Sequence, residues 1–225
     1  MRTRLNWDEY ATTWARLHGG FDPRFATPAV GGWLRLAYAI GSVLARLRVG
    51  PTAVTVVGLL LCLAVPWSVT QPPYGSFLGA ALVIFSALAD TVDGAIAVTT
   101  GRSSRLGYVY DSLADRIGEA AWLTAFWLLG AIGPVVVAAG GLSALHEYVR
   151  ARAAAAGMRE IGTVTIGERP TRVGITLIGF VVTGVGGLIQ ADLTPGIATL
   201  VVIIWLLVSL VGFGQLFAAV RSSLG

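Results

Sequence analysis

The chain is poor in charge and in cysteine, and it contains no lysine. Only 12% of its 225 residues are charged, 55% are hydrophobic, and the mean hydropathy is +0.75. These values exclude an ordinary soluble domain and indicate a polytopic membrane protein. The single cysteine, Cys62, excludes a disulfide within the chain. All 16 basic residues are arginine, which suits bidentate phosphate binding but carries little weight by itself.

The N-terminal region lacks the apolar run of a secretory signal peptide. Residues 7–18 and 28–48 instead mix Trp, Leu, Tyr and Arg, a composition typical of helices that lie at a membrane interface. We therefore expect residues 1–50 to form interfacial or juxtamembrane amphipathic helices, with the N-terminus in the cytoplasm.

Six apolar segments follow, each long enough to cross about 30 Å of hydrocarbon as a helix. Turn-forming residues rich in Gly, Pro and Ser separate most of them. The sequence thus predicts an all-α integral membrane protein with one six-helix transmembrane domain over residues 51–225. The expected spans are 51–70, 76–99, 107–130, 132–156, 170–191 and 195–220.

Arginine placement predicts the orientation of these spans. The loops after the second and fourth spans are rich in arginine, whereas those after the first, third and fifth contain none. Cytoplasmic loops carry such an excess, so both termini are expected in the cytoplasm of a protein integral to the cell membrane.

Four aspartates form a spaced constellation in the second and third expected spans: Asp90, Asp93, Asp111 and Asp115. Intervals of three and four residues place each pair on one helical face, so the two pairs can face each other across a helix hairpin. Charge at membrane depth is costly and is usually retained for function. A purely structural set of ion pairs with Arg105, Arg116 or Arg150 is the less favoured alternative.

Residues 90–115 read DTVDGAIAVTTGRSSRLGYVYDSLAD, and this stretch resembles the signature of the CDP-alcohol phosphotransferase family, D-x2-D-G-x2-A-R-x8-G-x3-D-x3-D. Every fixed position matches except one, because Val98 stands where the family has arginine. The matching residues are Asp90, Asp93, Gly94, Ala97, Gly107, Asp111 and Asp115. The six-span layout also fits the fold that this resemblance implies.

The chemistry of these residue types agrees with the resemblance. Hard divalent cations such as Mg²⁺ or Mn²⁺ take carboxylate oxygens together with substrate phosphates, and four carboxylates can hold two ions. The resemblance implies that Asp90, Asp93 and Asp111 are metal ligands, and that Asp115 binds metal and also acts as the general base. Gly94, Ala97 and Gly107 are small and leave room for a nucleotide. The expected nucleotide-binding residues are these three and Asp93.

Two downstream segments, HEYVRARAAAAGM from His146 and GERPTRV from Gly167, look like acceptor-phosphate segments of actinobacterial phosphatidylinositol-phosphate synthases. Converging guanidinium groups are typical of a phosphate pocket. The alternative for each arginine is a loop charge that sets topology or touches anionic lipid. The expected acceptor-binding residues are Arg105, Arg150, Arg152, Arg169 and Arg172.

The resemblance implies a CMP-releasing enzyme that moves a phosphatidyl group from CDP-diacylglycerol to a hydroxyl acceptor at the cytoplasmic face. Inositol phosphate, glycerol phosphate and phosphatidylglycerol all remain open as acceptors. We expect membrane lipids and a second copy of the chain as partners, in a homodimer, and no nucleic acid. Two alternatives remain: a catalytically altered or silent family member marked by Val98, and a membrane cation transporter.

Overall fold

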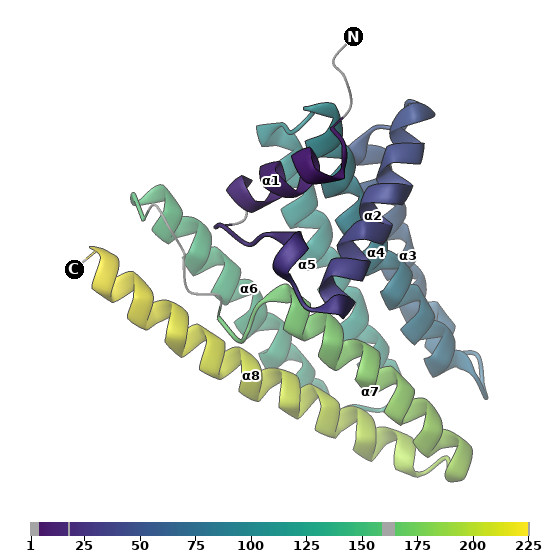
Figure 1. The fold of residues 1–225 in the computed structure, drawn as a ribbon. Coiled ribbons are helices and arrows are strands. Elements are labelled where there is room, and N and C mark those ends of the chain that lie inside the picture. The colour runs from purple at the N-terminus through teal and green to yellow at the C-terminus, as the bar shows by residue number, and fades with distance from the viewer. Residues whose placement is uncertain (1–4, 18, 159–164, 225) are drawn as a thin grey trace. The chain divides into compact units, whose positions relative to one another are not determined.

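A computed structural model describes residues 5–17, 19–158 and 165–224, and the part of the chain that it describes contains helices and no strand (Figure 1). The prediction of an all-helical protein is therefore confirmed. The elements are α1 (Trp7–Leu17), η1 (Pro23–Phe25), α2 (Pro28–Arg46), α3 (Pro51–Val69), α4 (Gly75–Thr100), α5 (Arg105–Leu128), α6 (Gly133–Ala155), α7 (Arg169–Ile189) and α8 (Leu193–Leu224).

The six helices from α3 to α8 coincide with the six expected spans to within a few residues. By length and composition, α3, α4, α7 and α8 can cross a membrane. The lower apolar content of α5 and α6 follows from their sequences, since α5 carries five charged residues between Arg105 and Glu119. That these two helices also cross the membrane remains a prediction.

Proline and glycine mark the helix ends for simple steric reasons. Proline occupies the first helical positions of α2, α6 and α7, where its missing N–H would have no helical partner. Gly130 follows α5 with φ +97°, a left-handed conformation that glycine adopts at little cost. A Cβ on Gly130 would also lie 2.8 Å from the ring of Pro195, so the turn requires glycine for space as well.

The chain forms two compact units. The first unit comprises Met1–Leu61 and Phe85–Ile117, and its apolar core contains Ala37, Val54, Val92 and Ile96. A hydrogen bond of 2.9 Å from Trp33 Nε1 to Thr91 Oγ1 ties α2 to α4. The domain boundary expected after residue 50 remains a prediction, and the residues on both sides of it belong to this unit.

The aromatic side of α1 is buried within the first unit. Tyr10 and Ala11 have no exposed surface, while Asp8, Glu9 and Thr12 on the other side are exposed or partly so. The amphipathic pattern predicted an interfacial helix, and the structure shows that its apolar face packs against protein.

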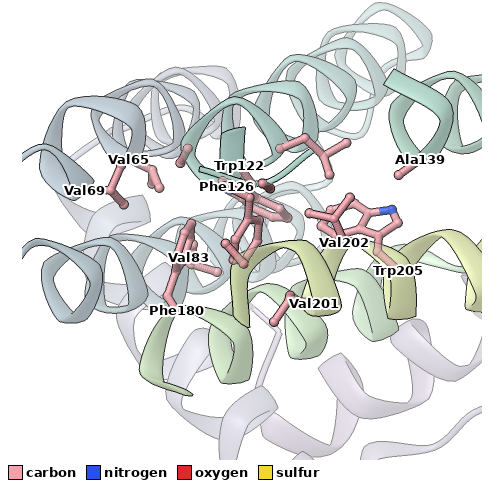
Figure 2. Close-up of a cluster of buried hydrophobic side chains, with 14 of the residues drawn as sticks. Val65, Val69, Val83, Trp122, Phe126, Ala139, Phe180, Val201, Val202 and Trp205 are labelled. Carbon is pink, nitrogen blue, oxygen red and sulfur yellow. The ribbon is translucent and has the colours of Figure 1, made fainter. Parts of the chain in front are cut away.

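The second unit comprises Cys62–Ile84 and Gly118–Gly225. Figure 2 shows its core, where side chains from six helices meet, among them Val65, Val83, Phe126, Phe180 and Trp205. The rings of Phe126 and Phe180 stack with centroids 4.4 Å apart. The long helix α8 packs along both α6 and α7, and Trp205 Nε1 donates a 2.9 Å hydrogen bond to Ser143 Oγ of α6 (Figure 1).

The turn before α7 makes a close backbone contact with α8. A Cβ on Gly212 would lie 2.5 Å from the amide nitrogen of Gly167, and a Cβ on Gly167 would lie 3.2 Å from Gly212 Cα. The amide of Ile166 also donates a 3.0 Å hydrogen bond to Gln215 Oε1. Glycine at both positions lets the two segments approach closely, as small residues do between membrane helices.

Candidate functional site: a cluster of aspartates on α4 and α5

Three of the four predicted aspartates converge in the first unit. Asp90 lies on α4, and Asp111 and Asp115 lie one turn apart on α5. One carboxylate oxygen from each residue lies within 4.8 Å of the others, and all three residues are half-buried. The spacing of the sequence motif therefore brings acidic groups from two helices to one place, as predicted.

The oxygen spacing suits a divalent cation. Mg²⁺ binds oxygens at about 2.1 Å, so two oxygens on opposite sides of the ion lie about 4.2 Å apart. Small side-chain adjustments would close the 4.8 Å cluster onto one ion. Clustering of like charges in partly buried surroundings is unfavourable unless a cation or proton compensates it. Arg116 Nη2 lies 3.8 Å from Asp115 Oδ2, and a bound metal would supply much more charge.

The fourth aspartate, Asp93, lies outside this group and is held by a hydrogen bond. Its residue is 7% exposed, and its Oδ2 accepts a hydrogen bond of 2.5 Å from Thr55 Oγ1 of α3. A carboxylate has two acceptor oxygens, so this bond is compatible with metal coordination through the other. Asp93 as a metal ligand and nucleotide contact therefore remains a prediction.

The small residues of the motif occupy different surroundings. A Cβ on Gly94 would meet nothing within 4 Å, so this part of α4 borders open space, and Ala97 is half-buried one turn beyond Asp93. Gly107 donates its amide to Ser104 Oγ at 2.9 Å, which caps the first turn of α5. Only Gly94 thus shows the open room expected beside a nucleotide.

The five predicted acceptor-binding arginines divide between the two units. Arg105 is exposed at the first residue of α5 in the first unit, whereas the other four lie in the second. Arg152 is exposed near the end of α6, and Arg169 is half-buried at the start of α7. Arg150 Nη1 lies 3.4 Å from Glu168 Oε1, the residue that precedes α7. Their convergence on a shared phosphate remains a prediction.

Arg172 is buried and bound by two carboxylates. It is 1% exposed, and its Nη1 donates hydrogen bonds of 2.9 and 2.7 Å to the two oxygens of Glu119. Its Nη2 donates to Glu147 Oε1 at 3.3 Å, and its Nε donates to the carbonyl of Gly167 at 2.8 Å. Glu147 therefore helps to hold Arg172, and Glu119 is the stronger partner.

A buried histidine, His146, is hydrogen-bonded to the segment that precedes α7. His146 Nε2 lies 3.1 Å from Thr165 Oγ1, and the amide of Thr165 donates to Glu168 Oε1 at 3.0 Å. These bonds connect α6 to the residues just before α7. They give His146 a packed, hydrogen-bonded role in the second unit.

Sequence reasoning missed two residues of these sites, Thr55 and the role of Glu119. Thr55 is one of a few hydroxyl residues in the largely apolar α3, and such a hydroxyl signals that a polar partner lies nearby. Glu119 lies in the apolar part of α5, which also signals a buried partner, but Arg172 is 53 residues away along the chain.

Three comparisons with known proteins bear on this site. A sequence model of the CDP-alcohol phosphatidyltransferase family matches residues 48–223. The phosphatidylinositol phosphate synthase of Mycolicibacterium smegmatis is 34% identical over 206 residues, which cover 86% of this chain and 87% of that protein. The archaetidylinositol phosphate synthase of Aeropyrum pernix is 34% identical over 141 residues, which cover 60% of this chain and 70% of that protein.

Solved structures show the same likeness. The Mycobacterium tuberculosis phosphatidylinositol phosphate synthase with CDP-DAG bound superposes with a TM-score of 0.67 at 30% identity, covering 85% of this chain and 96% of that one. The same synthase in complex with manganese and citrate gives 0.67 at 29% identity, covering 84% and 90%. The family match spans most of the chain and includes the whole aspartate motif, and the chain therefore belongs to the CDP-alcohol phosphatidyltransferase family.

Proposed function

We propose that this enzyme transfers the phosphatidyl group of CDP-diacylglycerol to inositol phosphate and releases CMP. The observation that carries the proposal is the convergence of Asp90, Asp111 and Asp115 on the family motif. The relatives named above are phosphatidylinositol phosphate or archaetidylinositol phosphate synthases, and the Mycobacterium tuberculosis enzyme has been solved with CDP-DAG bound. The transferase expected from the sequence is confirmed at the level of the family, and the cation-transporter alternative has no support.

The four aspartates are proposed to hold one or two Mg²⁺ or Mn²⁺ ions. Bound ions supply charge neutralisation for the donor diphosphate and for the oxygens that attack and leave. The residues fit such ions because they provide hard oxygen ligands from two helices. Thr55 fixes the rotamer of Asp93 by donating to its Oδ2, as outer-shell hydrogen bonds do for metal-ligating carboxylates.

Asp115 is proposed as the general base. Its carboxylate accepts the proton of the acceptor hydroxyl, the hydroxyl oxygen bonds to the phosphorus that carries the diacylglycerol, and the bond from that phosphorus to CMP breaks. The Arg116 guanidinium lies 3.8 Å from Asp115 Oδ2, so a cationic side chain adjoins the proposed base. The nucleotide is proposed to bind against four residues of the motif, Asp93, Gly94, Ala97 and Gly107.

The acceptor phosphate is proposed to bind Arg105, Arg150, Arg152 and Arg169. Arg150 and Arg169 belong to the segments that resemble those of phosphatidylinositol-phosphate synthases, and both are half-buried rather than freely solvated. Arg172 was expected among these ligands. Because two carboxylates already bind its guanidinium, we assign it the positioning of the turn that ends at Arg169.

We further propose six membrane spans, α3 to α8, a cytoplasmic site and both termini in the cytoplasm, in a homodimer. Thiol labelling tests the topology in a Cys62→Ala background. Asp192→Cys, in the turn before α8, should react with an impermeant maleimide on intact cells. Ser103→Cys, in the turn before α5, should react only after permeabilisation. The reverse pattern would overturn the orientation, and chemical cross-linking in native membranes tests for the dimer.

The activity test is CMP release by the purified chain in lipid nanodiscs with CDP-diacylglycerol and Mn²⁺ or Mg²⁺. Inositol phosphate, free inositol, glycerol phosphate and phosphatidylglycerol are compared as acceptors. We expect metal-dependent release with inositol phosphate and a product of matching mass. Release with a different acceptor would replace the acceptor assignment, and no release with any acceptor would favour the silent alternative marked by Val98.

A further inference from the structure

Four aromatic side chains of α1 and α2 cluster against α4 beside Val98; we term Trp7, Tyr10, Trp14 and Tyr38 the aromatic cap. The ring of Tyr10 lies at the centre of the cap, with centroids 5.0 Å from Tyr38, 5.6 Å from Trp7 and 5.8 Å from Trp14. The Tyr38 hydroxyl donates a 3.0 Å hydrogen bond to the carbonyl of Leu5, which ties the chain before α1 to α2. The cap is therefore a packed element of the first unit.

Val98 and Ala95 form the surface of α4 that the aromatic cap covers. Val98 is 9% exposed, and Ala95 and Tyr10 have no exposed surface. The Arg35 guanidinium already lies over the Trp7 ring, 5.2 Å from its centroid. A second long cationic side chain at position 98 would have to push apart the packed rings on α4, and overpacking of this kind is costly. The family signature has arginine at this position, so the cap and that arginine compete for the same space.

Residue 98 also lies beside the proposed nucleotide surface. It follows Gly94 by four residues, so their positions lie one helical turn apart on nearly the same face of α4. A Cβ on Gly94 would meet nothing within 4 Å, whereas Val98 is covered. The aromatic cap thus begins one turn beyond the open part of α4.

We propose that the contact between Val98 and the aromatic cap takes over the role of the family arginine. The aromatic side chains of α1 pack on Val98, and this packing fixes the part of α4 near Gly94 that binds the donor nucleotide. In this chain that part of α4 is held by packing instead of by an arginine at position 98. Val98 and Tyr10 are accordingly positioning residues, and restoring arginine at 98 unseats α1. This inference rests on the proposed function for its donor, CDP-diacylglycerol.

Substitutions of Tyr10 distinguish the contribution of ring packing from that of hydrogen bonding in this cap. Its oxygen is buried and makes no hydrogen bond to the residues that the structure describes. Burial raises the pKa of Tyr10 above its ordinary value, so the hydroxyl stays neutral. If the ring alone docks α1, Tyr10→Phe keeps the cap in place, whereas Tyr10→Ala removes its centre.

A double-mutant cycle tests the pairing, with Val98→Arg, Tyr10→Ala and the double variant. Trypsin can cut after Arg16 and Arg24 when α1 is released, so cleavage there reports docking without any substrate. We expect Val98→Arg to speed this cleavage at least 10-fold and to raise the KM for CDP-diacylglycerol about 10-fold with a smaller change in kcat. In the double variant the arginine has room, and the KM should return to within about 3-fold of the parent.

The controls are Tyr10→Phe, expected to resist trypsin like the parent, and Tyr74→Ala, which removes an exposed tyrosine of the second unit. Val98→Arg with unchanged trypsin resistance, or with a raised kcat/KM, would overturn the proposal and show that the position simply lacks its arginine. Additive effects of the two substitutions would also overturn it. If neither the parent protein nor any variant turns over CDP-diacylglycerol, the proposed function fails. The trypsin cleavage rates still show whether docking of α1 depends on Val98.

Discussion

The two units each contain a cluster of acidic residues, and the clusters differ in what compensates their charge. In the first unit, the carboxylates of Asp90, Asp111 and Asp115 converge while half-buried. In the second, Glu119 and Glu147 bind the guanidinium of Arg172, and both Glu119 and Arg172 are nearly inaccessible to solvent. The first cluster brings three carboxylates together with the Arg116 guanidinium 3.8 Å from one of them, and the second binds its two carboxylates directly to one buried guanidinium.

This difference distinguishes an ion-binding site from a structural group of ion pairs; we term Glu119, Glu147 and Arg172 the brace. Carboxylates held close together repel each other, and a bound cation relieves that repulsion, so such a cluster is suited to bind an ion. A buried pair with good hydrogen bonds is already neutralised, and removing one partner leaves an uncompensated charge. Substitutions in the two clusters should therefore affect different properties: activity in the first and folding stability in the second.

The largest expected effect is on catalysis in the first cluster. Asp115→Asn keeps the size of the side chain but removes the base and one anionic ligand, so the rate of CMP release should fall about 1000-fold. The unfolding temperature should stay within a few degrees of the parent. Asp192→Asn, in the exposed turn before α8, is the matched control and should keep full activity. Near-parental CMP release by Asp115→Asn would remove the proposed mechanism.

The next effect is on stability in the second cluster. Arg172→Met leaves two carboxylates without their shared guanidinium, and we expect a loss of about 3 to 5 kcal/mol in the free energy of unfolding. Thermal unfolding in detergent, followed by circular dichroism, measures it. The double variant Glu119→Gln, Arg172→Met should lose less, because it no longer buries an unpaired Glu119 charge. Equal losses in the single and double variants would contradict the brace.

A smaller effect concerns the hydrogen bond to Asp93. Thr55→Val removes the hydroxyl but keeps the shape, so Mn²⁺ should bind about 10-fold more weakly, as for loss of an outer-shell partner. The rise in unfolding temperature across a Mn²⁺ titration reports the affinity, because a ligand of the folded state stabilises it. Thr55→Ser keeps the hydroxyl and should bind Mn²⁺ like the parent. Weaker binding in both variants would point to packing instead.

The smallest effect distinguishes the two glutamates of the brace. Glu147 makes a single 3.3 Å contact with Arg172 and its side chain is 29% exposed, whereas Glu119 makes two shorter bonds and its side chain is 4% exposed. Glu147→Gln should therefore cost about 1 kcal/mol of unfolding free energy, and Glu119→Gln clearly more. The same thermal unfolding assay ranks the two variants, and the reverse order would show that Glu147 carries the brace.

The sequence predicted the helices and the aspartate cluster well because both depend on local periodicity. Apolar runs bounded by Pro and Gly gave the positions of α3 to α8, and the intervals within the motif placed Asp90, Asp111 and Asp115 on facing surfaces. These features need only the pitch of a helix and the direction of a hairpin.

Partners far apart in the chain could not be predicted in this way. Arg172 belongs to a basic segment and was expected to bind phosphate, but its strongest partner is Glu119, 53 residues earlier. Likewise, the amphipathic pattern of α1 shows that one face avoids water, but it does not show whether lipid or protein covers that face. The structure assigns it to Ala95, Val98 and Tyr38.

The contact of Gly167 with Gly212 constrains how this sequence can diverge. A Cβ on Gly212 would collide with the backbone of Gly167 at 2.5 Å, whereas a Cβ on Gly167 would lie 3.2 Å from Gly212 Cα and needs only a small shift. Lineages that gain a side chain at position 212 must shift α8 or lengthen the turn before α7. Gly212 is thus a marker for grouping homologues: those that keep it can share this approach of α8, and those that lose it must place the turn before α7 differently.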